Sequence, residues 1–183
     1  MDRRTELTEA ALEYVLANGL IGLSLRPLAA RLGTSDRMLI YHFGSKESLL
    51  TEVITLANRR IAASIGPADP PPRTAADLVH YTWNVLKTPA TLGTMRLYLE
   101  MCVLSVRDPQ RCATCHEQLR EPWLVMLRSG LAELGVPARR VTTLADLVLD
   151  TIDGLLLDRL VSQDPSRADA AAAAFADLLD PSA

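Results

Sequence analysis

The chain has 183 residues, of which 49 % are hydrophobic and only 4 % aromatic, so it can bury a sizeable aliphatic core. Its net charge of −3 argues against a surface that binds nucleic acid everywhere, and no apolar run approaches the ~20 residues of a membrane-spanning helix. The first residues are partly acidic and contain no apolar signal-peptide core, so we expect a cytoplasmic protein without a membrane partner.

The first predicted element is an amphipathic helix from Arg4 to Asn18. Its apolar residues recur at helical spacing on one stripe, at Leu7, Ala11, Tyr14 and Val15. Gly19 directly follows Asn18 and can take the left-handed conformation that ends a helix. We therefore expect the helix to bury one face and to stop at Asn18.

The next stretch, LSLRPLAARLGTSDRMLIYHFGSKESLL, predicts two short helices joined by a tight turn. Ser24 is suited to cap the first of them, and Gly33 is suited to end it. Ser35 can then cap the second, from Asp36 to Phe43. Two short helices with a glycine in the turn are typical of a helix-turn-helix, whose second helix enters the major groove of DNA.

The second short helix has one face for the core and one for solvent. Leu39 and Phe43 are four residues apart and point inward, which leaves its polar residues outside. Ser45 can cap a third, longer helix that begins at Lys46. Residues 1–66 have a net charge of only +1, against −4 for the remainder, so DNA binding would depend on where the cations lie.

The proline-rich segment from Gly66 to Pro72 cannot be helical and marks a boundary between two domains, 1–66 and 67–183. Pro122 should kink or split the helix in which it falls. The expected helices of the second domain are Thr74–Lys87, Pro89–Arg107, Gln110–Leu134, Ala138–Val161 and Ser166–Leu179. No stretch alternates as a strand would, so the fold class is all-α, with about nine helices.

The last two predicted helices carry more apolar residues than one buried face needs. Between Leu144 and Leu160 the apolar side chains surround the helix, and the final helix contains the alanine run 170–174. A helix that is apolar nearly all round must be covered on several sides, and alanine faces allow close approach. We therefore expect a two-fold, four-helix interface between two copies of the chain; packing on the domain's own core is the alternative.

The segment around the second short helix resembles the DNA-binding domain of the tetracycline-repressor (TetR) family of transcriptional regulators. The resemblance rests on three motifs, namely SLRPLA at residues 24–29, GTSDR at 33–37 and LIYHFGSKESL at 39–49. Arg37 stands where that family often has glycine, and Ile40 where it often has tyrosine. The resemblance implies an amino-terminal three-helix DNA-binding domain and a larger helical domain for ligand binding and dimerisation.

Candidate DNA contacts follow from the motif and from side-chain chemistry. An arginine at the start of such a helix can pair with both O6 and N7 of guanine, so Arg37 is a candidate for base recognition. Lys46, at a helix N-terminus, is suited to a phosphate. The full set of expected DNA-binding residues is Arg26, Thr34, Ser35, Asp36, Arg37, Tyr41, His42 and Lys46. Their alternatives are capping, packing on the neighbouring helix, or plain solvation.

The resemblance also implies a small-molecule pocket in the second domain. Candidate lining residues share helical faces and suggest a mostly apolar ligand, although a stripe of this kind also forms ordinary core. Asp150 and Asp153 are candidate polar contacts, or partners of Arg96 or Arg159. The expected ligand-binding residues are Trp83, Met95, Tyr98, Leu99, Cys102, Leu119, Trp123, Met126, Leu127, Leu147 and Thr151.

One further motif, Cys112-Ala-Thr-Cys115-His116, has the C-x-x-C-H spacing of haem attachment. Such attachment is usually met in exported proteins, so a redox pair or a metal site that includes Cys102 is the better special interpretation. The plain interpretation is that these cysteines are ordinary small helix residues in a reducing cytosol.

Together these features predict a homodimeric regulator that responds to a small molecule, more readily a repressor than an activator. It would bind a near-palindromic double-stranded DNA operator with half-sites ~34–36 Å apart, or a multiple of that spacing. No catalytic set of residues supports an enzyme, and we expect no cofactor and no metal. The alternative is a redox- or metal-responsive regulator, or a redox protein, that uses Cys102, Cys112, Cys115 and His116.

Overall fold

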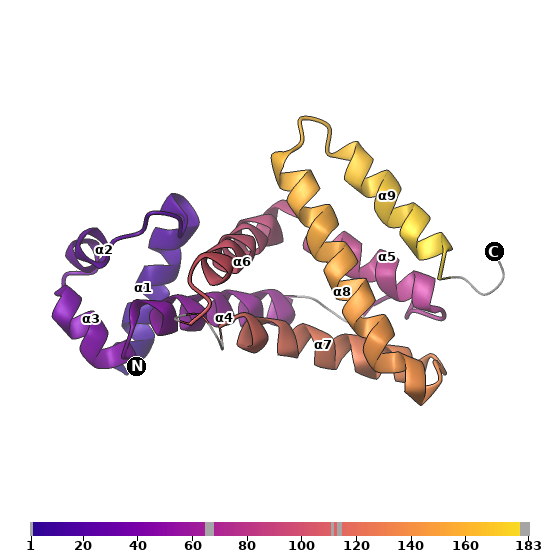
Figure 1. Ribbon diagram of the computed structural model, residues 1–183, viewed down its shortest axis with the longest axis horizontal. Helices are drawn as coiled ribbons and strands as arrows, with labels where there is room; N and C mark the ends of the chain where they lie inside the picture. The colour runs from indigo at the N-terminus through magenta and orange to yellow at the C-terminus, as the bar shows by residue number, and fades with distance from the viewer. Residues whose placement is uncertain (1, 65–67, 111, 113–114, 180–183) are drawn as a thin grey trace. The chain divides into compact units, whose positions relative to one another are not determined.

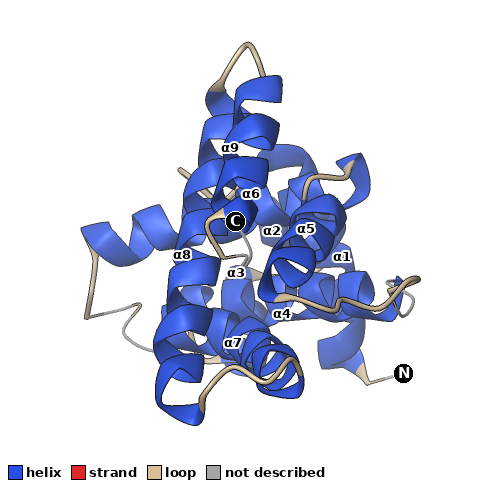
Figure 2. Ribbon diagram, turned by 90° about the vertical axis from the view of Figure 1, so that its right-hand side faces the viewer, coloured by secondary structure: helices blue, strands red, loops and turns tan. Residues whose placement is uncertain are grey.

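The computed structural model describes residues 2–64, 68–110, 112 and 115–179, and every regular element in them is an α-helix (Figures 1 and 2). The described helices are α1 Arg3–Asn18, α2 Leu25–Arg31, α3 Asp36–Phe43, α4 Lys46–Ser64, α5 Ala75–Leu86, α6 Pro89–Arg107, α7 Cys115–Glu133, α8 Ala138–Val161 and α9 Ser166–Asp177. The expected all-α fold is thus confirmed. Within these residues no helix has the length and apolarity that crossing a membrane would require.

The predicted and observed helices differ most at α7. This helix begins at Cys115 rather than at Gln110, because main-chain bonds from Cys112 to Asp108 and from Cys115 to Cys112 form turns before it. It then runs through Pro122 as one continuous helix, so of the two predicted outcomes, a kink or a split, the split does not occur. Proline removes one hydrogen bond of the helix, and the buried side chains on either side, such as Leu119 and Leu124, keep both halves packed.

The described chain divides into two compact units. The amino-terminal unit comprises residues 1–64 and 96–119, and the carboxy-terminal unit comprises residues 65–95 and 120–183. Residues 96–119, which lie beyond the proline-rich boundary and were expected in the second domain, therefore pack with the first 64 residues. Helices α6 and α7 each continue from one unit into the other.

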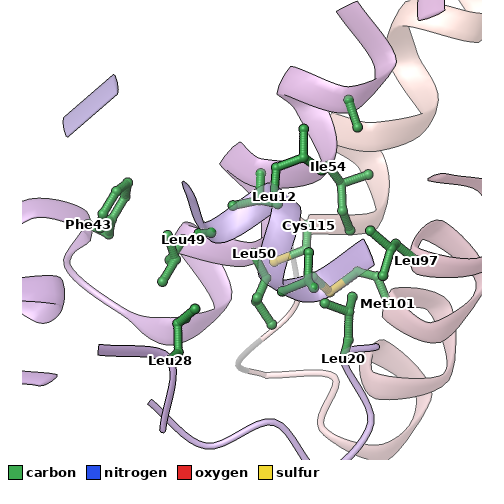
Figure 3. Packing of buried hydrophobic residues seen from close by; sticks show 14 of the residues in the cluster. Leu12, Leu20, Leu28, Phe43, Leu49, Leu50, Ile54, Leu97, Met101 and Cys115 are labelled. Carbon is green, nitrogen blue, oxygen red and sulfur yellow. The ribbon is translucent and has the colours of Figure 1, made fainter. Parts of the chain in front are cut away.

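The amino-terminal unit has an aliphatic core built from helices distant in sequence (Figure 3). Leu12 of α1 and Ile54 of α4 are both fully buried in it. Leu97 and Met101 of α6 enter the same cluster, as do Leu119 and Cys115 of α7. This burial explains why part of the predicted second domain belongs to the first packed unit.

The carboxy-terminal unit is held together by α5, α8 and α9, and α8 and α9 lie side by side in Figure 1. Asp169 of α9 accepts a hydrogen bond from the indole N–H of Trp83 at 2.8 Å. The same carboxylate pairs with Lys87 at 3.3 Å and with Arg159 at 2.9 Å. One side chain thus joins the three helices.

Candidate nucleic-acid interface

The turn between α2 and α3 is fixed by main-chain hydrogen bonds. Thr34 N–H donates to the carbonyl of Ala29 at 3.0 Å, and Gly33 N–H donates to that of Ala30 at 3.3 Å. This pattern is a Schellman motif, which needs a left-handed residue, and Gly33 has a φ of 63°. The predicted role of Gly33 is confirmed, and the turn fixes the direction in which α3 leaves α2.

Helix α3 is capped at its start and anchored along one side. The hydroxyl of Ser35 accepts the N–H of Met38 at 3.2 Å, as its position in the sequence predicts. Leu39 and Phe43 are 1 % and 5 % exposed, so they hold the inner face in the core. Since both anchors lie on one side, the opposite side of α3 faces solvent.

All eight expected DNA-binding residues reach the surface of the amino-terminal unit. Arg26, Ser35, Asp36, Arg37 and Tyr41 are exposed, and Thr34, His42 and Lys46 are half-buried. Six of them lie on α3 or directly before it, while Arg26 lies on α2 and Lys46 begins α4. The fold therefore gathers them around one short helix.

Arg37 and Tyr41 are one helical turn apart on the outer side of α3. Tyr41 is 78 % exposed, and its ring meets that of His42 edge-on at a centroid distance of 5.3 Å. Asp36 accepts the backbone N–H of Arg37 at 3.0 Å rather than pairing with its side chain. The Arg37 guanidinium makes no ion pair with any residue that the structure describes, so it is available to a ligand.

Lys46 has a structural contact that the sequence does not reveal. Its ammonium donates a hydrogen bond to the carbonyl of Leu23, in the connection between α1 and α2. The predicted cap of α4 is also present, because the hydroxyl of Ser45 accepts the N–H of Ser48 at 3.0 Å. An ammonium has three donors, so this contact leaves Lys46 able to bind a phosphate as well.

Arg3 and Arg4 of α1 are neutralised by acidic residues of the same unit. Arg4 pairs with Glu52 at 2.6 Å and lies 5.3 Å from the centroid of the Phe43 ring. The hydrogen bond and charge of Glu52 raise the pKa of the Arg4 guanidinium, and Arg3 pairs with Glu6 at 3.1 Å. Arg3 and Arg4 therefore add little net positive charge near α3, whereas Arg26 and Arg37 have no ionic partner among the described residues.

Two apolar residues of α3 also belong to this surface, although neither is among the contacts expected from the sequence. Met38 is 41 % exposed and Ile40 is 40 % exposed. Helical spacing predicts their exposure, because the residues directly before and after the buried Leu39 cannot point in the same inward direction.

The expected ligand-binding residues are divided between the two units. Tyr98, Leu99, Cys102 and Leu119 lie in the amino-terminal unit, where Tyr98 and Leu119 are core residues. The carboxy-terminal unit holds Trp83, Met95, Trp123, Met126, Leu127, Leu147 and Thr151. In that unit the indole N–H of Trp83 is already bound to Asp169, and Leu147 is 50 % exposed on α8.

Met126 lines a cavity of about 660 Å³ within the carboxy-terminal unit. Leu78 and Tyr81 of α5 and Glu133 near the end of α7 also line it. The walls are mainly apolar, and the hydroxyl of Ser129 donates to Glu133 at 3.2 Å. This composition suits a largely apolar small molecule.

The two aspartates of α8 have a different partner from those considered in the sequence. Arg120 of α7 pairs with Asp150 at 2.7 Å and lies 3.6 Å from Asp153. Arg96 and Arg159 instead pair with Glu100 and Asp169. The carboxylates therefore tie α8 to α7.

The cysteines do not form a reactive pair on the surface. Cys112 and Cys115 are 4 % and 5 % exposed, and all three cysteines are free thiols. Burial raises the pKa of the Cys112 thiol, which lowers its thiolate fraction at neutral pH. No group of three metal-binding side chains occurs in the described part of the chain. These observations favour the plain interpretation of the C-x-x-C-H motif.

Solved structures of other proteins share this fold over nearly the whole length of the chain. A TetR-family transcriptional regulator from Rhodococcus sp. superposes with a TM-score of 0.72 at 17 % identity, covering 97 % of both chains. The multidrug binding protein EbrR complexed with proflavin gives 0.69 at 22 % identity, covering 98 % of this chain and 100 % of that one. A transcriptional regulator from Saccharomonospora viridis in complex with choline gives 0.65 at 20 % identity, covering 95 % and 93 %.

Sequence comparison identifies the helix-turn-helix itself. No curated protein matches the chain. Residues 7–53, however, match the family described as bacterial regulatory proteins, tetR family. That range contains α2, the turn at Gly33 and α3. Residues 7–53 are therefore a TetR-family DNA-binding domain, and the chain that contains them has the fold of TetR-family transcriptional regulators.

Proposed function

We propose that this protein is a homodimeric repressor that binds a near-palindromic operator and leaves it when a small molecule binds. The observation that carries the proposal is the outer side of α3, where Arg37 and Tyr41 are exposed and Arg37 has no ionic partner among the described residues. Helix α3 then enters the major groove, with Arg37 on base edges and Lys46, Tyr41 and His42 near phosphates.

A second copy of the chain supplies the recognition helix for the other half-site of the operator. Along α8, residues alternately three and four apart are all exposed, namely Leu147, Asp150, Gly154, Leu157 and Val161. Leu157 is 50 % exposed and Val161 is 71 % exposed, which is unusual on a helix whose other face is core. A spacing of three and four is that of helices packed nearly parallel or antiparallel. The exposed alanines 170, 171 and 174 of α9 permit close approach.

The two recognition helices of such a dimer would reach half-sites ~34–36 Å apart, or a multiple of this. In this proposal residues 1–66 bind DNA, and residues 67–183 bind the effector and dimerise. The effector acts by preferring a dimer whose recognition helices do not match the operator spacing, since a ligand with equal affinity for both forms shifts nothing.

We assign the effector to the class of mostly apolar small molecules. The main support is the largely apolar cavity that contains Met126, with Glu133 and Tyr81 as polar groups. Proflavin and choline, the compounds named with two similar structures, are organic cations. A carboxylate and an aromatic ring are suited to a cation of this kind.

The decisive experiment is selection of bound duplexes from a random DNA pool with the full-length chain. We expect enrichment of one sequence with inverted half-sites, and protection of both half-sites in a footprint. Enrichment of a single unrepeated half-site would contradict binding as a homodimer, and no enrichment at all would contradict the DNA-binding role.

A further inference from the structure

Helix α3 carries two large apolar side chains on its solvent side. Met38 and Ile40 are about equally exposed, at 41 % and 40 %, while Leu39 between them is buried at 1 %. Successive helical residues are ~100° apart around the axis, so Met38 and Ile40 lie on the two edges of the arc that contains Arg37 and Tyr41. The side of α3 that is proposed to face DNA thus has polar residues at its centre and one apolar residue at each edge.

The major groove offers few partners for such side chains. Its base edges present hydrogen-bond donors and acceptors, and their one apolar group is the 5-methyl of thymine. A methionine or isoleucine placed against a donor or acceptor would bury that polar group without a partner, at a cost to binding. Against a thymine methyl, the same side chain removes apolar surface from water on both molecules.

We propose that Met38 and Ile40 are specificity-determining residues that recognise thymine through its 5-methyl group. The inference rests on the proposed operator binding and goes beyond it, because it names a base and the group by which it is read. Each half-site then contains thymine beside the base pair that Arg37 contacts. Recognition at that thymine is independent of charge, since neither side chain is ionised.

The test replaces thymine by deoxyuridine, which removes only the methyl group and keeps base pairing and the O4 acceptor. The operator is first taken from the random pool selected with the full-length chain. Each thymine of a half-site is then replaced singly, and the dissociation constant is measured by fluorescence anisotropy at one salt concentration. We expect at least one replacement to weaken binding about three- to fivefold, the factor that corresponds to one buried methyl group.

Variants of the protein assign that methyl group to a side chain. Met38→Ala or Ile40→Ala should reduce the effect of the sensitive deoxyuridine to less than about 1.5-fold, because the partner of the methyl group is gone. Both positions are exposed, so both variants should unfold at the wild-type temperature. Arg37→Ala is the matched control: it weakens operator binding through the loss of another base contact but keeps the deoxyuridine effect.

The outcomes separate this inference from the function on which it rests. A pool without an enriched sequence overturns both. An enriched operator in which no deoxyuridine weakens binding overturns the inference alone, and so does a deoxyuridine effect that persists unchanged in both alanine variants. In those cases the apolar edges of α3 contact something other than thymine. Loss of the effect in either variant supports the inference and identifies the residue.

Discussion

Glu100 of α6 accepts a hydrogen bond from the main-chain N–H of Leu20, in the connection between α1 and α2. The same carboxylate oxygen accepts the N–H of Ile21 at 3.2 Å, and Arg96 donates to the carbonyl of Leu16 at 2.6 Å. The Leu16 carbonyl belongs to the last turn of α1, where a helix leaves carbonyls without internal partners, and the N–H groups of Leu20 and Ile21 lie in the connection that follows. Helix α6 therefore completes the hydrogen bonding of the connection that precedes the helix-turn-helix.

Glu100→Ala should destabilise the amino-terminal unit. The N–H of Leu20 belongs to a fully buried residue, and leaving it without an acceptor costs about 1–3 kcal/mol. That cost corresponds to a decrease of about 2–12 °C in the unfolding temperature, measured by circular dichroism. Glu100→Gln keeps a carbonyl acceptor and should retain most of the stability. Equal unfolding temperatures for Glu100→Ala and the wild type would show that water replaces the carboxylate.

Asp169 should make the stability of the carboxy-terminal unit dependent on pH. Partial burial alone would raise its pKa, but hydrogen bonds from Trp83, Arg159 and Lys87 outweigh burial and lower the pKa of this carboxyl. Because the pKa of Asp169 is lower in the folded state, the ionised carboxylate stabilises that state, and this stabilisation is complete well above the unfolded pKa of ~3.9. The contribution is then lost as the pH falls through that value to the folded one.

The measurement is urea unfolding at neutral pH and between pH 4 and pH 2. At neutral pH Asp169→Asn should be less stable than the wild type, and at the lowest pH the two should converge. Asp177→Asn is the control, since Asp177 is exposed on the same helix and its side chain makes no hydrogen bond or ion pair with a described residue. A constant difference between Asp169→Asn and the wild type at every pH would contradict the assignment.

Cys112 and Cys115 should react slowly with a thiol reagent in the native protein. Both are buried, and burial raises the pKa of Cys112, so thiolate is scarce at pH 7. Three thiols should titrate in denaturant, both before and after treatment with peroxide. Rapid native reaction of two thiols, or loss of two thiols to peroxide, would instead support the redox alternative at Cys112 and Cys115.

These contacts indicate which parts of the molecule a sequence can predict. The signals that succeeded are local: Gly33 ends α2, Ser35 caps α3, and Leu39 with Phe43 defines the inward face within five residues. Each of these depends on neighbours in the chain, so composition and spacing suffice.

The parts that sequence reasoning missed depend on partners far away in the chain. Nothing near Lys46 indicates that its ammonium binds Leu23, and nothing near Asp150 selects Arg120 from several arginines. The same limit applies to the candidate ligand-binding residues. Helical phase showed which of them share a face, but it could not show that Trp83 is held by Asp169.

Arg37→Ala should reduce sequence preference more than overall affinity for DNA. A bidentate contact to guanine is worth about 1–3 kcal/mol of discrimination, so operator binding should weaken by about 5- to 150-fold for each half-site. Binding to a scrambled duplex at the same salt should change little. Lys46→Ala should weaken both duplexes alike and flatten the salt dependence, because a phosphate contact carries no sequence information.

Both variants are compared in anisotropy titrations on the operator and on the scrambled duplex. The unfolding temperature of Lys46→Ala is measured beside them, since this variant also loses the hydrogen bond to Leu23. Equal losses on the two duplexes for Arg37→Ala would remove this residue from base recognition.

Leu157→Glu should convert the dimer to a monomer. Leu157 is half-exposed on the outer stripe of α8, so a glutamate there should be tolerated within one chain. In a two-fold interface the same change buries two unpaired carboxylates, which should raise the dimer dissociation constant at least about a hundredfold. Val125→Glu is the matched control, because Val125 is 56 % exposed on α7, outside the stripe.

Sedimentation at micromolar concentration then distinguishes the two variants. Leu157→Glu should sediment as a monomer and bind the full operator no more tightly than an isolated half-site, because each half-site then binds its own copy without a linked partner. Val125→Glu should remain a dimer with wild-type affinity. If Leu157→Glu still sediments as a dimer, α8 is not the interface. If the wild type is itself a monomer, the proposal that the protein binds its operator as a homodimer is wrong.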